Sequence, residues 1–260
     1  MLFRSVHHNR GVALAKLGRT GEALAAFDRA LAINPQDAEA HHGSGLALAQ
    51  LGRTGEALAA FDRALAINPQ DARTHYNRGV ALAKLGRTDE ALAAFDRALA
   101  IDPKDAKVHY QRGVALTQLG RTDEALAAFD RALAINPQDA RAHYRRGVAL
   151  AQLGRTDEAL AAFDRALAIN PQDAEAHYWR GVALAKLGRM DEALAAFDRA
   201  LAINPQDAEA HHGRGLALTL LGRMDEALAA FDRALAIDPQ DAEAHSSRGA
   251  VLTQIGRAHV

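Results

Sequence analysis

Apolar residues recur at three- and four-residue steps along the chain, a spacing that predicts amphipathic helices. The clearest stretch reads EALAAFDRALAI and occurs seven times without change, each copy 34 residues after the last. In the copy at residues 56–67, Phe61 and Leu65 belong to the apolar stripe, while Asp62 and Arg63 face outward. A fixed period of this length predicts an all-α solenoid, in which each helical unit packs only against its neighbours.

Each repeat is predicted to contain two helices, which we call helix A and helix B. In the second repeat, Asp37 can cap helix A with its carboxylate. Helix A should end near Gly52, because glycine adopts the left-handed conformation at low cost. Thr54 is then the expected cap of helix B, which should end before Pro69 because proline disfavours helix in the preceding residue. Short connections make the two helices antiparallel neighbours.

The repeat register predicts that the whole chain, residues 1–260, forms a single array of repeats. Seven repeats are expected at about 4–37, 38–71, 72–105, 106–139, 140–173, 174–207 and 208–241, followed by a lone helix A at 242–257. Helix A of every repeat carries a glycine in its middle, for example Gly45 and Gly79. Mid-helix glycine costs about 1 kcal/mol relative to alanine. We therefore expect close approach of another helix at each of these glycines.

The unit reads H-x2-R-G-x2-L, then A-x3-F, then P, with Ala57, Phe61 and Pro69 as its second half in repeat two. This pattern resembles the tetratricopeptide repeat family, and the resemblance covers practically the whole chain. It implies a right-handed superhelix of antiparallel helix pairs, and an interaction scaffold rather than an enzyme. It also implies that helix A lines a concave groove that contacts ligands.

The sequence departs from the family pattern at three helix A positions: histidine replaces the usual tryptophan, leucine the usual tyrosine, and arginine usually stands before the glycine. We expect the histidines to be buried between helices; a shared metal is disfavoured because equivalent positions lie about 10 Å apart. The arginine is either part of a basic stripe or, as we favour, an ion-pair partner of the outward aspartate of helix B. The aligned histidines are His7, His41, His75, His109, His143, His177, His211 and His245.

The amino-acid composition argues against several classes of function. The formal net charge is −1, so no basic field indicates nucleic acid binding, and the absence of cysteine excludes thiol chemistry. No apolar run approaches the roughly 18 residues of a membrane span, and residues 1–10 lack the apolar core of a secretion signal. We find no catalytic motif, cofactor motif or metal site. A cytoplasmic, non-catalytic protein is expected.

Nearly all variation between repeats falls in helix A. By the resemblance, its second, fifth, sixth, ninth, twelfth and thirteenth positions contact ligands. In repeats three to six, the second, fifth, sixth and thirteenth of these include cations, all four tyrosines and the only tryptophan. We therefore predict a groove that binds an acidic peptide segment with apolar anchors; the alternative is drift on a solvated face. The predicted groove residues are Arg73, Tyr76, Asn77, Lys84, Lys107, Tyr110, Gln111, Arg141, Tyr144, Arg145, Tyr178 and Trp179.

Two other functions fit the same pattern. The array could be the targeting or spacer segment of a larger enzyme, such as a glycosyltransferase of the kind that carries such arrays. It could also be a structural array that associates with itself. The lone helix at 242–257 has no helix B to cover it, so we expect an exposed apolar edge at Gly249, Val251, Leu252 and Ile255, and end-to-end association through it.

Overall fold

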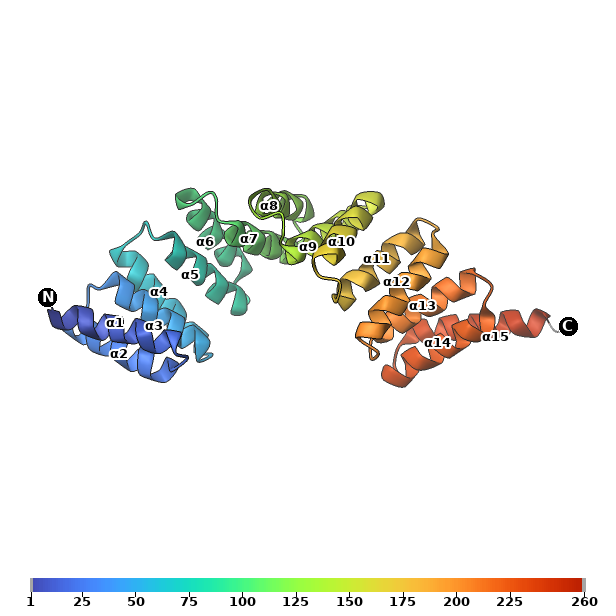
Figure 1. Ribbon diagram of the computed structural model, residues 1–260, viewed down its shortest axis with the longest axis horizontal. Coiled ribbons are helices and arrows are strands. Elements are labelled where there is room, and N and C mark those ends of the chain that lie inside the picture. Colours follow the sequence, from blue (N-terminus) through green and yellow to red (C-terminus); the bar gives the residue numbers. More distant parts are fainter. Residues whose placement is uncertain (1, 259–260) are drawn as a thin grey trace. The chain divides into compact units, whose positions relative to one another are not determined.

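The chain folds into α-helices joined by short turns. The computed structural model describes the backbone of residues 2–258 and the side chains of residues 6–256. It divides into two compact units, Met1–Ile135 (unit 1) and Asn136–Val260 (unit 2). Within each unit the two helices of a repeat lie antiparallel and side by side (Figure 1). The predicted all-α solenoid of helix pairs is confirmed, and one continuous array over residues 1–260 stays a prediction.

Odd-numbered elements are helix A and even-numbered elements are helix B. Each helix B packs against helix A of its own repeat and, inside a unit, against helix A of the next repeat. The bounds are α1 (Leu2–Lys16), α2 (Thr20–Ile33), α3 (Ala38–Gln50), α4 (Thr54–Ile67), α5 (Ala72–Lys84), α6 (Thr88–Ile101), α7 (Ala106–Gln118), α8 (Thr122–Ile135), α9 (Ala140–Gln152), α10 (Thr156–Ile169), α11 (Ala174–Lys186), α12 (Met190–Ile203), α13 (Ala208–Leu220), α14 (Met224–Ile237) and α15 (Ala242–Ala258).

Helix A and helix B begin in different ways. Asp37 caps α3 as predicted, since its Oδ1 accepts a hydrogen bond of 3.2 Å from the backbone N–H of Ala40. The predicted threonine cap of helix B is wrong, because Thr54 is already the first residue of α4. Arg53 stands at the cap position and makes no side-chain cap hydrogen bond; its guanidinium instead donates to both carboxylate oxygens of Glu56, at 2.7 Å each.

The turn between helix A and helix B depends on a left-handed glycine. Gly52 follows α3 with a φ of 76°, and the equivalent glycine of every other repeat also has positive φ. The N–H of the next residue, Arg53, then donates a hydrogen bond of 2.9 Å to the carbonyl of Leu48 in the last turn of α3. Glycine is favoured at this position because a side chain would strain the left-handed conformation.

The core of each repeat is one phenylalanine of helix B placed over the mid-helix glycine of helix A. Phe61 is only 1% exposed, and a β-carbon on Gly45 would lie 2.5 Å from its ring. The same arrangement recurs in each of the other six repeats, where the phenylalanine is at most 2% exposed. The close approach expected from the sequence is therefore confirmed, and it explains why the mid-helix glycines are kept despite their cost in helix stability.

The aligned histidines are mostly not buried, so that prediction is wrong for all but one of those described. His41 is 9% exposed, whereas the equivalent residues from His75 to His211 are half-buried and His245 is exposed. Each of these histidines from His41 onward has Nε2 within 2.9–3.1 Å of the carbonyl of the proline six residues earlier. A carbonyl only accepts, so Nε2 must carry the proton. The imidazole thus ties helix A to the turn that precedes it.

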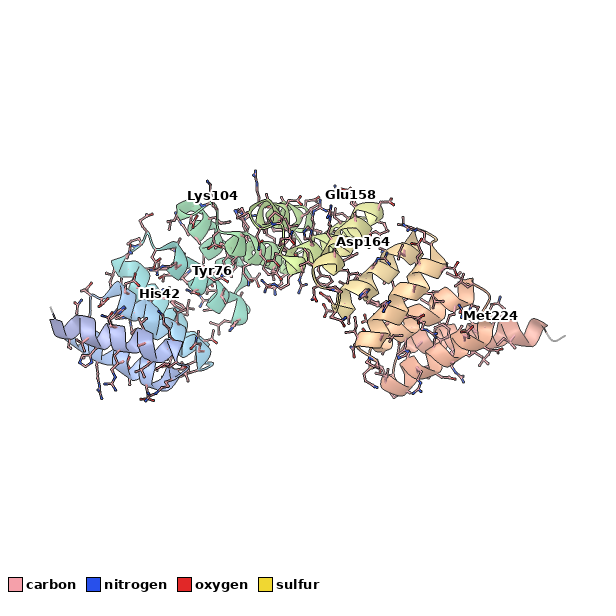
Figure 2. The ribbon with its side chains drawn as sticks, in the orientation of Figure 1. His42, Tyr76, Lys104, Glu158, Asp164 and Met224 are labelled. Carbon is pink, nitrogen blue, oxygen red and sulfur yellow. The ribbon has the colours of Figure 1, made fainter. Side chains whose placement is uncertain are left out.

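The arginine before the glycine pairs with helix B of the preceding repeat, as we favoured from the sequence. Arg180 Nε lies 2.6 Å from Asp164 Oδ1, a side chain labelled in Figure 2. Four further pairs have the same geometry, Arg78–Asp62, Arg112–Asp96, Arg214–Asp198 and Arg248–Asp232. These arginines are therefore engaged in contacts between repeats and do not form a free basic stripe.

The last helix, α15, leaves part of its apolar face uncovered. Leu252 is 44% exposed, although the equivalent Leu218 of the preceding repeat is fully buried. A β-carbon on Gly249 would meet no atom within 4 Å. Val251, which we expected at the same edge, is only 1% exposed. The apolar edge is confirmed at Gly249 and Leu252 and wrong at Val251; association through it stays a prediction.

Candidate functional site

The predicted groove residues lie on helix A elements of both units. In unit 1 they belong to α5 and α7, which contact each other, and in unit 2 to α9 and α11, which also contact each other. Equivalent positions therefore repeat along a surface of adjoining A helices within each unit, and Figure 2 labels two of them, His42 on α3 and Tyr76 on α5. We call this the helix A surface.

The cations of unit 1 differ in how they are engaged. The guanidinium of Arg73 lies 2.8 Å from Glu39 of the preceding repeat and 3.2 Å from Asp71, the cap of its own helix. Its side chain is nevertheless 64% exposed. Lys107 is exposed and makes no ion pair with any described residue, and the same is true of Lys84. Among the predicted groove residues of unit 1, the two lysines are the cations that a ligand can reach without displacing a partner.

The tyrosines of unit 1 cover the core phenylalanine of their own repeat. The rings of Tyr76 and Phe95 lie 6.2 Å apart between centroids, and those of Tyr110 and Phe129 lie 5.9 Å apart. Both tyrosines are half-buried, as are their neighbours Asn77 and Gln111. Tilted rings at this separation attract each other. Packing thus explains part of what the sequence suggested was a ligand-binding aromatic surface.

The tyrosines of unit 2 use the same packing and also interact with a glutamate of the next repeat. Tyr144 is 9% exposed and Tyr178 is half-buried. Burial, followed by the charge of Glu209 and its hydrogen bond with the phenol, raises the pKa of Tyr178 to about 12. Burial and Glu175 raise the pKa of Tyr144 in the same way. Both phenols therefore stay protonated and donate toward a carboxylate.

The other site residues of unit 2 are more accessible. Arg145 is exposed, with its guanidinium carbon 5.6 Å from the centroid of the Tyr144 ring. Trp179 is half-buried and meets Tyr178 edge-on at 5.5 Å. Arg141 has its side chain 73% exposed and lies 3.5 Å from Asp139, the cap of its helix. The predicted residues of each unit are thus on one surface, although several of them also stabilise the fold.

The sequence analysis did not predict one buried hydrogen-bond network between α3 and α5. His42 Nδ1 lies 2.6 Å from the hydroxyl of Thr74, which donates to Asp71 Oδ2 at 2.6 Å. Because the threonine proton goes to the carboxylate, its oxygen accepts from Nδ1–H of His42. Burial lowers the pKa of His42, although the charge of Asp71 opposes this. This network links α3 to α5. The sequence analysis missed it because His42 and Thr74 belong to different repeats.

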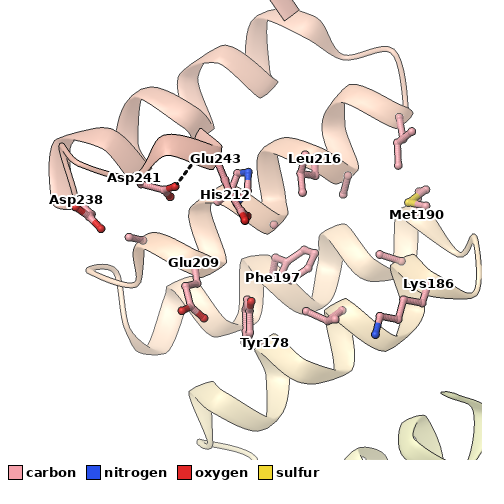
Figure 3. Close-up of a pocket in the computed structure, with 16 residues that line it drawn as sticks. Tyr178, Lys186, Met190, Phe197, Glu209, His212, Leu216, Asp238, Asp241 and Glu243 are labelled. Carbon is pink, nitrogen blue, oxygen red and sulfur yellow. Dashed lines mark hydrogen bonds between the residues drawn. The ribbon is translucent and has the colours of Figure 1, made fainter. Parts of the chain in front are cut away.

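The helix A surface also contains two hollows that the sequence analysis did not identify. One, of about 340 Å³, lies in unit 1 beside Gly43, and the other, of about 680 Å³, lies in unit 2 beside Gly213. In both repeats the sixth position of helix A is glycine, where the intervening repeats have Asn, Gln, Arg or Trp. The HHG triplet at these two places was the available signal. Figure 3 shows the hollow of unit 2.

The described part of the chain contains neither a candidate metal site nor a candidate membrane-spanning helix. Among residues with described side chains, no group of three or more histidine, aspartate or glutamate side chains is placed to hold a metal ion. No helix of the described residues combines the length and the apolar character that crossing a bilayer needs.

The fold and the repeated surface define an α-solenoid of helix pairs. The sequence profile described as "Tetratricopeptide repeat" matches residues 8–72, 45–106, 110–174, 154–208 and 191–242. The chain therefore belongs to the tetratricopeptide repeat family. No curated protein matches it.

Several solved structures are similar to this chain. YrrB, described as "a TPR protein with an unusual peptide-binding site", is 29% identical with a TM-score of 0.66, over 74% of this chain and 99% of YrrB. MamA from Desulfovibrio magneticus RS-1 is 25% identical with a TM-score of 0.62, over 66% of this chain and 97% of MamA. PilF of Pseudomonas aeruginosa is 21% identical with a TM-score of 0.72, over 82% and 97%, and supports the fold alone.

Proposed function

We propose that this chain is a non-catalytic scaffold that holds a peptide segment of a partner protein on its helix A surface. The observation that carries the proposal is the contrast between the two helices of each repeat. From its third residue onward helix B reads EALAAFDRALAI in all seven copies, whereas helix A differs from repeat to repeat at positions with exposed side chains such as Lys107 and Arg145. A surface whose residues vary while its support is constant can be specific for one partner.

The chemistry of the surface favours an acidic segment with one or two apolar anchors. Lys84 and Lys107 in unit 1 and Arg145 in unit 2 present charge to solvent, beside half-buried aromatic rings. Arg73 and Arg141 are paired within the chain, but exposed pairs contribute only about 0–1 kcal/mol, so a ligand carboxylate can replace the partner. The similarity to YrrB, whose structure is described as having an unusual peptide-binding site, supports a peptide as the ligand.

Reversing three cations tests this proposal. The wild-type protein is expected to select acidic peptides with apolar anchors from an array of dodecapeptides that vary in net charge and aromatic content. The variant Arg73→Glu/Lys107→Glu/Arg141→Glu should bind the selected peptides about tenfold more weakly or worse, with a flatter salt dependence, because it loses electrostatic complementarity. Glutamate is already present at this helix position in four other repeats, so the fold should tolerate the change.

The matched control reverses three exposed arginines of helix B, Arg63→Glu, Arg97→Glu and Arg131→Glu. This variant has the same net charge as the first but an intact helix A surface, and it should keep the wild-type selection. Equal selection by the wild type and the helix A variant would show that the helix A surface is only a solvated face and that the proposal is wrong.

Two other readings stay predictions. The exposed Leu252 and open Gly249 of α15 favour a structural array that associates with itself. The targeting or spacer segment of a larger enzyme, such as a glycosyltransferase, is compatible with the same helix A surface, because such a segment would also act by binding. A cytoplasmic location likewise stays a prediction.

A further inference from the structure

The hollow of unit 2 is apolar at one end, and it is open because Gly213 has no side chain to fill it. It lies between α11 and α13, where Gly213 leaves the phenyl ring of Phe197 as part of the lining. A β-carbon on Gly213 would come within 2.8 Å of that ring. One end of the hollow is formed by Val182, Met190 and Leu216. Leu216 is 43% exposed, so this end offers apolar surface to a ligand rather than being closed by packing.

The opposite end of the same hollow is acidic. Figure 3 shows Glu209 beside Tyr178, with Asp238, Asp241 and Glu243 nearby and Lys186 toward the apolar end. Lys186 is the only cation among the lining residues. Asp238 and Asp241 accept hydrogen bonds from backbone N–H groups near the start of α15 and are thereby partly explained.

Glu209 accepts a hydrogen bond from the phenol of Tyr178, but no described residue forms an ion pair with Glu209 or Glu243. Both stand in the first turn of a helix, where the helix dipole favours a carboxylate by only a few tenths of a kcal/mol.

The hollow of unit 1 serves as an internal comparison, because its residues occupy equivalent positions five repeats earlier. There Arg73 takes the place of Glu243 and pairs with Glu39, the equivalent of Glu209, at 2.8 Å. Gln50 takes the place of Leu220 and lies 3.2 Å from the hydroxyl of Thr20. The unit 1 hollow is therefore smaller and its glutamate is paired with an arginine, while the unit 2 hollow is larger and has two glutamates and two aspartates in its lining.

We propose that the unit 2 hollow binds a basic anchor of a partner peptide: a large apolar residue against Leu216 and Met190, and an arginine or lysine against Glu209 and Glu243. The inference rests on the proposed peptide-binding function and assigns this end of the helix A surface a ligand of opposite charge. Glu209 and Leu216 are seven residues apart on α13, about 10 Å along the helix. At about 3.3 Å per extended residue, the two anchors are three positions apart in the peptide.

Three labelled peptides test the inference. The probe is fluorescein-labelled Gly-Leu-Gly-Gly-Arg-Gly, and its counterparts carry citrulline or glutamate in place of arginine. Fluorescence anisotropy should show that the wild type binds the arginine peptide about tenfold more tightly than the citrulline peptide and binds the glutamate peptide most weakly. Glu243→Arg, which recreates the Arg73 arrangement of unit 1, should remove the preference for arginine. Leu220→Gln should weaken the arginine and citrulline peptides alike.

Two further variants separate the hollow from general charge effects. Asp225→Arg changes the charge by the same amount on exposed surface of α14 outside the hollow and should leave the preference intact. Gln50→Leu/Arg73→Glu in unit 1 should create a second hollow of the unit 2 type and raise the number of bound arginine peptides from one to two.

Equal binding of the three peptides, or a preference that survives Glu243→Arg, would overturn the inference. If acidic peptides from the array bind while the arginine peptide does not, the inference fails and the proposed function stands. If neither kind binds, both fail.

Discussion

Replacing Phe163 by alanine is expected to lower the free energy of unfolding by about 3–5 kcal/mol. The ring is fully buried, packs against Tyr144 with centroids 6.1 Å apart, and occupies the space left by Gly147. Removing it would leave a cavity between α9 and α10, and stability in a solenoid depends on contacts inside a repeat and with its neighbours. Urea unfolding followed by circular dichroism measures the loss.

The matched control for this prediction is Arg165→Ala, two residues along the same helix and exposed. It should change stability by less than about 0.5 kcal/mol. A loss of less than about 1 kcal/mol on replacing Phe163 would contradict the account, because it would mean that the repeated phenylalanine is not what holds the helix pairs together.

The same substitution in two equivalent glycines should have opposite effects on stability. A β-carbon on Gly215 would lie 2.5 Å from the ring of Phe231, which is fully buried and cannot move aside. Gly215→Ala should therefore be destabilising, since overpacking costs about 1–3 kcal/mol. Gly249 has no helix B over it and no atom within 4 Å. Gly249→Ala should stabilise by up to about 1 kcal/mol through helix propensity.

Thermal and urea unfolding of the two variants against the wild type give the comparison directly. The two sites share the same local sequence position and differ chiefly in whether a phenylalanine packs on them. Destabilisation of equal size at both would show that glycine is needed for the backbone of helix A itself, and not for the contact with helix B.

The helix pairs were predictable because each is specified locally and seven times over. The period, the aspartate cap at Asp37, the turn glycine at Gly52 and the glycine–phenylalanine contact each depend on a single repeat, so repetition makes them unmistakable. The threonine cap failed for a local reason as well. Helix B starts at Thr54, one residue earlier than expected, so the cap position falls on Arg53, and an arginine–glutamate pair stabilises the first turn instead.

The candidate site was less predictable because its contacts join different repeats. Arg73 was predicted to contact a ligand in the groove, yet it is hydrogen-bonded to Glu39, which lies 34 residues earlier. The histidines were expected to replace a buried tryptophan, but imidazole is smaller and bonds to the preceding turn. The hollows arise from side chains that are absent, at Gly43 and Gly213, and a pattern of residues present does not show how much space they leave.

The most direct test of the central claim, that helix B builds the array and helix A binds, is hydrogen exchange with and without a bound peptide. An acidic dodecapeptide selected from the array is added at saturation, and exchange is followed by mass spectrometry. Helix A fragments from α5, α7, α9 and α11 differ in sequence and are read separately, whereas fragments from the EALAAFDRALAI stretch of helix B are identical and are read as a sum. The account predicts slower exchange in these helix A fragments and an unchanged helix B signal. Slower exchange confined to helix B would contradict it.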